Sequence, residues 1–297
     1  MIGLVLLAYM ITKLLSCCEA QIDGKTLGLY YEKIKENLKP SHLSPDTYPE
    51  LKSELYQGDI LLPVTRNAII SEYYKWPKGI IPYILSPNIM PEDRLKIRNA
   101  MDFLESKTCL KFTDKNDNKS TNKINIGHNE YLSIQSEKSK GCYAMIGYHE
   151  NYGMPHKMNL ESPACLTSQG TIQHELLHVV GLLHEQARYD RDNAVIIYWE
   201  NIDKVYWQDF GKVPENVTTT FGLPYDYTSV MHYPRYAFSK NGLETIVAKY
   251  DQSMALGQRN GATSTDIQKV NLMYNCSGTS SYISSTTSYL TNKFKVF

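Results

Sequence analysis

Apolar residues early in the chain follow two patterns, and each predicts an element of secondary structure. The run Ile80-Ile81-Pro82-Tyr83-Ile84-Leu85 favours a β-strand, because β-branched and aromatic side chains fit a pleated sheet. Pro91, which two acidic residues follow, suits the first turn of a helix. The apolar positions of this helix include Ile97, Met101 and Leu104. We therefore predict a strand followed by a helix.

Similar patterns occur further along the chain. The segments from Lys123 to Gly127 and from Cys142 to Gly147 each predict a further strand. The segment Thr265-Asp266-Ile267-Gln268 fits a capping box, in which the first and last side chains each bond the other residue's backbone. It predicts a helix that reaches Cys276. Residues 277–297 are rich in Ser and Thr and contain no second module, so we expect a disordered tail.

The N-terminus carries a short apolar run. Residues Ile2 to Ile11 are too few to span a bilayer, and they lead to Cys18-Glu19-Ala20, a small-residue cleavage context. We interpret residues 1–20 as a secretory signal peptide. An uncleaved anchor is the alternative, because no basic residue precedes the run and Lys13 follows it.

The segment that follows, up to Arg66, is polar and contains four prolines, at positions 40, 45, 49 and 63. It lacks a long apolar periodicity and reads as an extended pro-segment, residues 21–66, rather than a packed domain. We place a catalytic domain at residues 67–276.

Composition limits the class of protein. The chain has 297 residues, of which 42% are hydrophobic, enough to bury one substantial core or two lobes. Its 31 basic and 31 acidic residues give zero formal net charge, which argues against a nucleic acid partner.

One motif carries candidate metal chemistry. His174 and His178 are four positions apart, so one helix can direct both rings at a single point, and Gly181 can end that helix so that the chain delivers His184. Three histidines suit one catalytic Zn²⁺ with a position left for water, and Glu175 lies beside it as a general base.

The alternative interpretation is a buried helix with ordinary core histidines, and for a single histidine it is the better one. We apply it to the histidines that have no second ligand at a metal spacing and polar or loop-like surroundings, namely His42, His128, His149 and His156. We expect His232 to orient the site rather than to bind metal.

The chain continues as Gln186-Ala187-Arg188-Tyr189-Asp190-Arg191-Asp192, and downstream it contains Ser229-Val230-Met231-His232-Tyr233. With Glu185 directly after the third histidine, these residues resemble the astacin branch of the metzincin zinc proteases. The resemblance implies an α+β, two-lobed metzincin fold with a cleft between the lobes. It implies an N-terminal mixed sheet with a long zinc-binding helix, and a C-terminal lobe of mostly irregular structure with a terminal helix.

The resemblance also implies roles for single residues. Met231 would form an apolar floor under the zinc, and Tyr233 would alternate between a fifth-ligand position and a contact with the transition state. A merely packed aromatic is the alternative for Tyr233, since the chain has 23 tyrosines. The strand from Cys142 would be the sheet edge that pairs with an extended substrate.

The cysteines indicate an oxidising compartment. Cys17 and Cys18 would leave with the signal peptide, and the remaining four are Cys109, Cys142, Cys165 and Cys276. Spacing alone allows three pairings. The resemblance implies Cys109 with Cys276 and Cys142 with Cys165. Sequons at Asn118 and Asn216 are candidate glycosylation sites, whereas Asn275 is doubtful because Cys276 is its middle residue.

The end of the pro-segment resembles the astacin element in which an aspartate, here Asp59, occupies the open position of the zinc in the zymogen. Gly58 would allow close approach of the backbone, although Gly-Asp pairs often form ordinary turns. Activation would require a trypsin-like protease to cut after Arg66, so that Asn67 starts the mature chain. In the family the new N-terminus is coupled to the glutamate after the third histidine, here Glu185.

We therefore predict a secreted, extracellular zinc endopeptidase, made as a zymogen, that cleaves extended protein or peptide substrates with Glu175 as general base of a zinc-activated water. We expect no stable membrane association. A catalytically silent, zinc-stabilised binding protein and another metzincin subfamily are the alternatives. Many astacins prefer an acidic residue just after the scissile bond, and Arg235 is one candidate cation for it.

Overall fold

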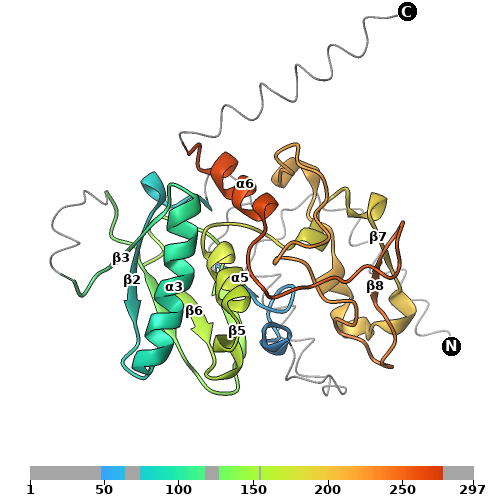
Figure 1. Ribbon diagram of the computed structural model, residues 1–297, viewed down its shortest axis with the longest axis horizontal. Helices are drawn as coiled ribbons and strands as arrows, with labels where there is room; N and C mark the ends of the chain where they lie inside the picture. Colours follow the sequence, from blue (N-terminus) through green and yellow to red (C-terminus); the bar gives the residue numbers. More distant parts are fainter. Residues whose placement is uncertain (1–47, 64–73, 118–126, 154, 277–297) are drawn as a thin grey trace, which may run out of the picture. The chain divides into compact units, whose positions relative to one another are not determined.

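The computed structural model describes residues 48–63, 74–117, 127–153 and 155–276 (Figure 1). All of them belong to one compact unit. In these ranges, no helix combines the length and the apolar character needed to cross a membrane.

Several predictions concern residues outside those ranges. They are the signal peptide (1–20), most of the pro-segment (21–47), the cleavage site at Arg66 and Asn67, the sequon at Asn118, His42 and the tail (277–297).

The sheet is mixed and has six strands in the order β1-β5-β6-β4-β2-β3. The strands are β1 (Ile60–Leu61), β2 (Ile80–Leu85), β3 (Lys111–Asp114), β4 (Leu132–Gln135), β5 (Cys142–Met145) and β6 (His156–Leu160). Strand β5 pairs antiparallel with β6, whereas β1 pairs parallel with β5 through Ile60 and Ala144. Strand β1 therefore covers one side of β5, and β3 forms the other edge of the sheet.

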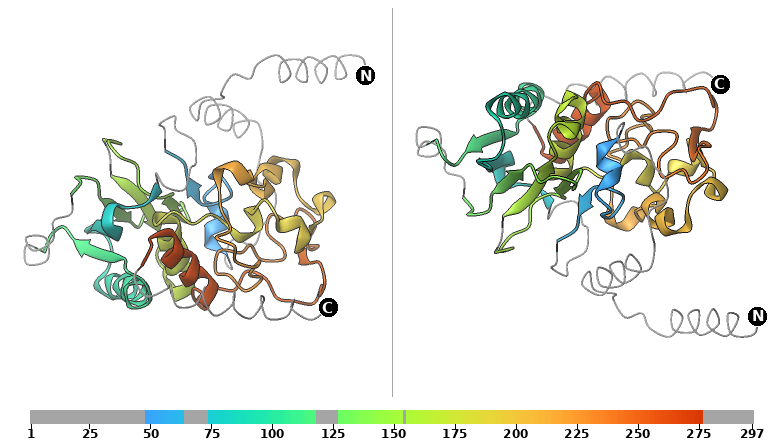
Figure 2. Two further views of the ribbon diagram at one scale, coloured as in Figure 1. Left: turned by 90° about the horizontal axis from the view of Figure 1, so that it is seen from above. Right: turned by 90° about the horizontal axis from the view of Figure 1, so that it is seen from below.

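Two helices cover one side of this sheet, α3 (Pro91–Lys107) and α5 (Gln169–Val179) (Figure 2). Ile97, Met101 and Leu104 of α3 are fully buried. They join Leu176 and Leu177 of α5 in the largest hydrophobic cluster, which also contains side chains of β2, β4, β5 and β6. Burial of this apolar surface fixes α5, and with it the histidines that α5 carries.

The chain beyond α5 contains short turns, one small sheet and a final helix. Strand β7 (Val195–Ile197) pairs antiparallel with β8 (Ile246–Ala248), and α6 spans Ser264–Met273. A second hydrophobic cluster includes Phe210, Tyr233 and Phe238. The 3₁₀ turns are η1 (Pro49–Lys52), η3 (Pro77–Gly79), η4 (Ala164–Leu166), η5 (Glu185–Ala187), η6 (Arg191–Asn193), η7 (Trp199–Asn201), η8 (Lys204–Phe210) and η9 (Glu215–Val217).

The predicted strand at Ile80–Leu85 and the helix that begins at Pro91 are confirmed. The strand from Cys142 ends at Met145, two residues earlier than predicted, where the N–H of Gly147 bonds the carbonyl of His178 instead of a neighbouring strand. Of the strand predicted at Lys123 to Gly127, only Gly127 is described, and it has a φ of +79° outside any strand.

The predicted capping box at Thr265 is wrong by two residues. The box that forms joins Thr263 to Asp266, and the helix ends at Met273 rather than at Cys276. The segment that begins at Thr263 and the segment that begins at Thr265 both fit the sequence pattern of a capping box. Asp266 decides between them because it is fully buried and also accepts hydrogen bonds from Ser229 and Val230.

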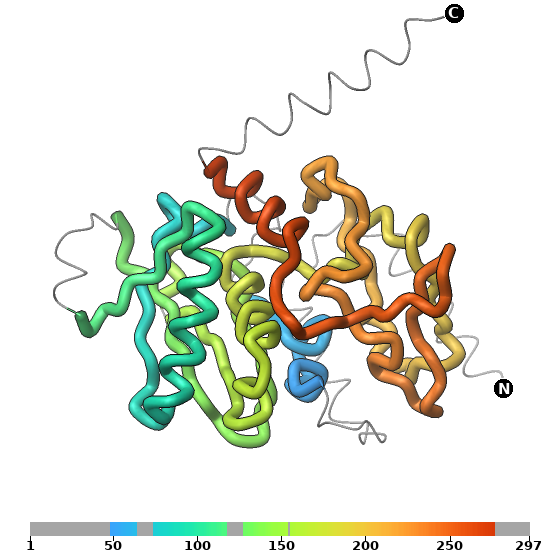
Figure 3. The backbone as a smooth tube through the Cα atoms, in the orientation of Figure 1, coloured from blue at the N-terminus to red at the C-terminus, as the bar shows by residue number. Residues whose placement is uncertain are grey.

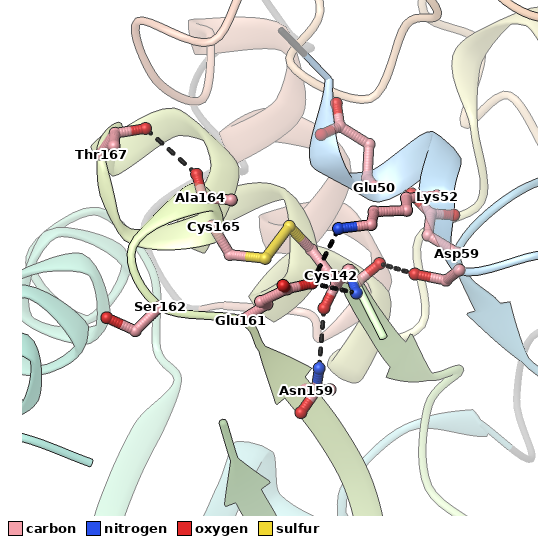
Figure 4. The surroundings of a disulfide bond; sticks show 12 residues. Glu50, Lys52, Asp59, Cys142, Asn159, Glu161, Ser162, Ala164, Cys165 and Thr167 are labelled. Atoms are coloured by element: carbon pink, nitrogen blue, oxygen red, sulfur yellow. Dashed lines mark hydrogen bonds and ion pairs between the residues drawn. A yellow bond between two sulfur atoms is a disulfide. The ribbon is translucent and has the colours of Figure 1, made fainter. Parts of the chain in front are cut away.

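The described residues form two disulfides, Cys109–Cys276 and Cys142–Cys165, the same pairing that the resemblance implied. The second joins β5 to the turn before α5 (Figure 4). Close to it, Glu161 accepts hydrogen bonds from the N–H of Gly141 and from Lys52 of the pro-segment. Covalent and polar links therefore hold together β5, the turn before α5 and the turn that contains Lys52.

Candidate metal centre

Helix α5 presents His174 and His178 one turn apart, and both side chains are fully buried. The helix ends at Val179, and Gly181 follows with a φ of +107°, a conformation that glycine adopts without a steric penalty. The chain then reverses and places His184, 2% exposed, next to the two helical histidines. The ring centroids of His178 and His184 are 4.7 Å apart.

In each of the three rings, Nδ1 lies within hydrogen-bonding distance of an oxygen that can act only as a hydrogen-bond acceptor. His174 Nδ1 donates to the carbonyl of Val230 and His178 Nδ1 to that of Leu182, each at 2.7 Å. His184 Nδ1 donates to the side-chain oxygen of Gln57 at 3.1 Å. With the proton on Nδ1, each Nε2 carries a free lone pair, which is the tautomer that a metal ligand needs.

The three Nε2 atoms converge on Asp59, which directly precedes β1. Asp59 Oδ2 lies 3.0 Å from His174 Nε2, and Oδ1 lies 3.5 Å from His178 Nε2 and 3.3 Å from His184 Nε2. All four ligand atoms lie within 4.8 Å of one another. Lone pairs that face one another at these distances in a buried site repel unless a cation lies between them, and three nitrogens with one carboxylate oxygen suit Zn²⁺.

The charges in the centre agree with this arrangement. Burial lowers the pKa of His174 and of His184 to about 4, so both rings are neutral at pH 7. Burial alone would raise the pKa of Asp59, but His184, His178 and His174 together lower it well below its usual value. The centre therefore combines the neutral imidazoles of His174 and His184 with an ionised carboxylate.

Glu175 lies next to the cluster and is fully buried. Neither of its carboxylate oxygens has a hydrogen-bond partner in the part of the chain that the structure describes. Burial and the nearby carboxylate of Asp59 raise its pKa well above the usual value. A buried carboxyl group without a structural partner is costly for folding, which points to a chemical role.

Met231 and Tyr233 lie on the turn that follows Ser229, and each is 1% exposed. The Tyr233 ring lies 4.9 Å from the His184 ring, centroid to centroid. Its hydroxyl donates a 2.5 Å hydrogen bond to the backbone carbonyl of Gln57. His232 lies outside the metal group: its ring bonds the hydroxyl of Tyr225 and the carbonyl of Tyr233, both at 2.7 Å.

The stretch from Tyr48 to Pro63 passes along this centre, and Figure 3 shows it in blue beside α5. Gly58, with a φ of +86°, brings the chain so close that an added Cβ would lie 3.2 Å from Phe238 and 3.6 Å from the Tyr233 hydroxyl. The stretch also places the fully buried side chain of Gln57 on His184.

Sequence reasoning missed three of the side chains around the centre. Gln57 is one, and the second is Arg259, whose guanidinium forms a buried ion pair with Glu50 at 2.5 Å. The third is Lys269, which forms a buried ion pair with Glu185. None of them stands at a recognisable spacing from the histidines, so no sequence signal marked them.

Of the remaining histidines, His128 and His149 lie in partly exposed loops as predicted, whereas the surroundings predicted for His156 need correction. None of His128, His149 and His156 belongs to the metal group found among the described residues. However, His156 is fully buried at the start of β6 and stacks on His149, with ring centroids 5.6 Å apart, so it is a core residue. Of the sequons, Asn216 lies in η9 at the surface.

Comparisons with known proteins agree with this geometry. Residues 68–275 match the model of the Astacin family of peptidases. The chain is 38% identical to zinc metalloproteinase nas-4 of Caenorhabditis elegans over 235 residues, 75% of this chain and 70% of that protein. It is 39% identical to the low choriolytic enzyme of Oryzias latipes over 232 residues, 75% of this chain and 79% of that protein.

A solved structure is also similar, that of high choriolytic enzyme 1, described as a hatching enzyme zinc-protease from Oryzias latipes. Its TM-score is 0.61 at 33% identity, over 71% of this chain and all of that one. The fold and the three-histidine centre define the class of protein, which is that of the zinc-dependent metalloendopeptidases. The chain belongs to the astacin family, and zinc is its cofactor.

Proposed function

We propose that this chain is the zymogen of a secreted astacin-type endopeptidase. In this proposal His174, His178 and His184 hold the zinc, and Asp59 is the fourth ligand until the pro-segment is removed. The observation that carries it is the convergence of three Nε2 atoms on Asp59, with each Nδ1 bonded to an oxygen.

The bound zinc supplies a Lewis acid that polarises a peptide carbonyl and lowers the pKa of water. Glu175 accepts the proton of the attacking water and passes it to the leaving amine, a role that its two unpartnered oxygens and raised pKa support. The Tyr233 hydroxyl, which donates to the carbonyl of Gln57, donates to the substrate carbonyl oxygen as charge develops there. Met231 packs beneath the histidines.

The pro-segment keeps this machinery inactive. Asp59 lies where a water would bind, Gln57 engages both His184 and Tyr233, and β1 pairs with the edge strand β5. A cut after Arg66 by a trypsin-like protease, with Asn67 as the new N-terminus, releases these contacts. The exposed edge of β5 then binds an extended substrate by backbone hydrogen bonds.

An acidic substrate side chain suits Arg259 better than Arg235. Arg235 bonds Glu244 and the carbonyl of Met254, residues that remain after activation. The carboxylate partner of Arg259 is Glu50, which leaves with the pro-segment. Because an unpaired buried guanidinium is costly, we propose that Arg259 receives an acidic side chain of the substrate in place of Glu50.

Export completes the proposal. Both disulfides are consistent with an oxidising compartment. Asn216 lies on the surface, where an oligosaccharide can be attached, and Asn118 is the second proposed acceptor.

The test is hydrolysis of quenched peptides by the full chain from a secretory host, before and after trypsin, with and without a zinc chelator. We expect trypsin to switch on activity that the chelator removes. Glu175→Gln is the matched control, because it should keep the zinc content and lose the activity. A processed, zinc-loaded protein that cuts no peptide would overturn the proposal in favour of a silent binding protein.

A further inference from the structure

The carboxylate of Glu185 is 2% exposed and is fully engaged. Its Oε2 accepts from Lys269 Nζ, and its Oε1 accepts from Arg188 Nη1 at 3.1 Å and from the N–H of Asp226 at 2.9 Å. All three donors come from the part of the chain that remains after the pro-segment is removed. The carboxylate is therefore paired with cations before any cleavage.

Lys269 is held rigidly for this contact. Its side chain is 9% exposed and projects from α6, whose start is fixed by the capping box of Thr263 and Asp266. Asp266 also accepts from the Ser229 hydroxyl at 2.5 Å and from the N–H of Val230 at 3.0 Å. Helix α6 therefore contacts the Ser229–Tyr233 turn through Asp266, and Glu185 through Lys269.

Glu185 connects this ammonium group to the zinc centre. The N–H of Glu185 donates to the carbonyl of Met231 at 3.0 Å, and Glu185 directly follows His184. A displaced Glu185 would move both the third histidine and the turn that carries Tyr233. A pocket lined by Leu183, Thr219 and Phe221, among others, opens onto the Glu185–Lys269 pair.

We infer that Lys269 is a positioning residue. Its buried ammonium fixes Glu185, and through Glu185 it fixes the turn that carries Met231. Catalysis therefore does not depend on which residue becomes the new N-terminus. This inference rests on the proposed function of the centre. Its physical basis is that a buried carboxylate needs a counter-charge, and Lys269 supplies one from inside the folded domain in both the uncleaved and the cleaved chain. An N-terminal ammonium that reaches the pocket meets a carboxylate that is already neutralised.

The experiment uses the full chain with two activation sequences, the natural one and one with a single alanine inserted after Arg66. Trypsin then releases mature chains whose N-termini differ by one residue, and N-terminal sequencing verifies each cut. Both sequences are combined with wild-type Lys269, with Lys269→Met and with Lys269→Arg, which keeps the charge. The kcat and KM of peptide hydrolysis, the zinc content and the hydrogen exchange of the Glu185 and Asp226 amides are measured.

With Lys269 in place, we expect the insertion to change kcat by less than about twofold. With Lys269→Met, the inserted chain should lose roughly tenfold or more in kcat at nearly unchanged KM, and the two amides should exchange faster. Lys269→Arg should restore both kcat and the rate of amide exchange to the wild-type values. A wild-type chain that loses more than about tenfold on insertion, or a Met variant that behaves as the wild type does, overturns the inference.

The readouts separate this inference from the proposed function. If the processed wild type is zinc-loaded but cuts nothing, the proposed function fails, while amide exchange still reports whether Lys269 holds Glu185. If Lys269→Met does not fold, the two chains with wild-type Lys269, one with and one without the inserted alanine, still show whether kcat depends on the exact N-terminus.

Discussion

The Tyr233 hydroxyl donates a 2.5 Å hydrogen bond to the backbone carbonyl of Gln57, so the uncleaved chain already presents a peptide carbonyl to the side chain proposed to stabilise the transition state. In the proposed zymogen, this segment therefore occupies the position of a substrate oxygen as well as that of the catalytic water. Three residues in a row, from Gln57 to Asp59, contribute to this occupation.

Replacing Tyr233 with Phe removes only the hydroxyl from a ring that is packed against Phe210 and Phe238. We expect kcat of the activated enzyme to fall by about 100-fold, the effect typical of one lost oxyanion donor, with KM nearly unchanged. Steady-state kinetics on one peptide check this. A loss confined to KM would mean that the hydroxyl contributes to binding only.

Asp59→Ala should make the uncleaved chain active, because the position next to the three histidines becomes available to water. We expect peptide hydrolysis without trypsin to rise at least about tenfold over the uncleaved wild type. Glu54→Gln is the matched control, since Glu54 is exposed in the same segment. Equal activity of the Asp59→Ala chain and the wild type before cleavage would show that Gln57 and β1 block the site without the aspartate.

Arg259→Gln should reduce the preference for an acidic residue next to the scissile bond. We expect the ratio of kcat/KM between a glutamate peptide and its glutamine analogue to fall by roughly tenfold or more, because one buried ion pair with the substrate is lost. The ratio is the useful quantity, since Arg259 also donates to the carbonyls of Val230 and His232, and its loss can lower both rates together. An unchanged ratio would assign specificity to another residue.

His156 should make stability depend on pH. Burial, with its neighbours His149 and His128, lowers the pKa of His156 from 6.5 to about 3. Between these values the unfolded chain takes up a proton that the folded chain does not, so the free energy of unfolding falls as pH drops from 6.5 towards 3. The expected slope from this one group is roughly 1.4 kcal/mol per pH unit.

Urea unfolding of the wild type and of His156→Gln, both with excess chelator, measures this contribution. Between about pH 7 and about pH 5 the wild type should lose about 2 kcal/mol more than the variant. Parallel losses in the two proteins would show that His156 is not held neutral in the fold.

The elements that could be predicted from sequence are those whose information is local. The four-residue spacing of His174 and His178 implies one helix face, and the run at Ile80–Leu85 matched the observed bounds of β2. Local patterns failed where two overlapping segments fit the capping-box pattern equally well, as the segments that begin at Thr263 and at Thr265 do. There the choice depended on the burial of Asp266, which is a tertiary property.

The charged partners around the centre lay beyond sequence reasoning. Lys269 pairs with a glutamate 84 positions away, and Arg259 with one 209 positions away. No periodicity links such residues, because the pairs exist only after α6 and the pro-segment have packed on the core. The same holds for His156, whose burial depends on Trp76 and Tyr148, whose rings pack against it.

The parallel pairing of β1 with β5 affects solubility as well as activity. When Ile60 and Leu61 leave with the pro-segment, β5 becomes an open sheet edge whose backbone groups can recruit any extended chain, including a second molecule of the enzyme. Strand β5 has only four residues and ends before Gly147, so the edge is short. In the proposed zymogen, the segment that contains β1 therefore also covers a sheet edge through which two molecules could associate, until it is cleaved off.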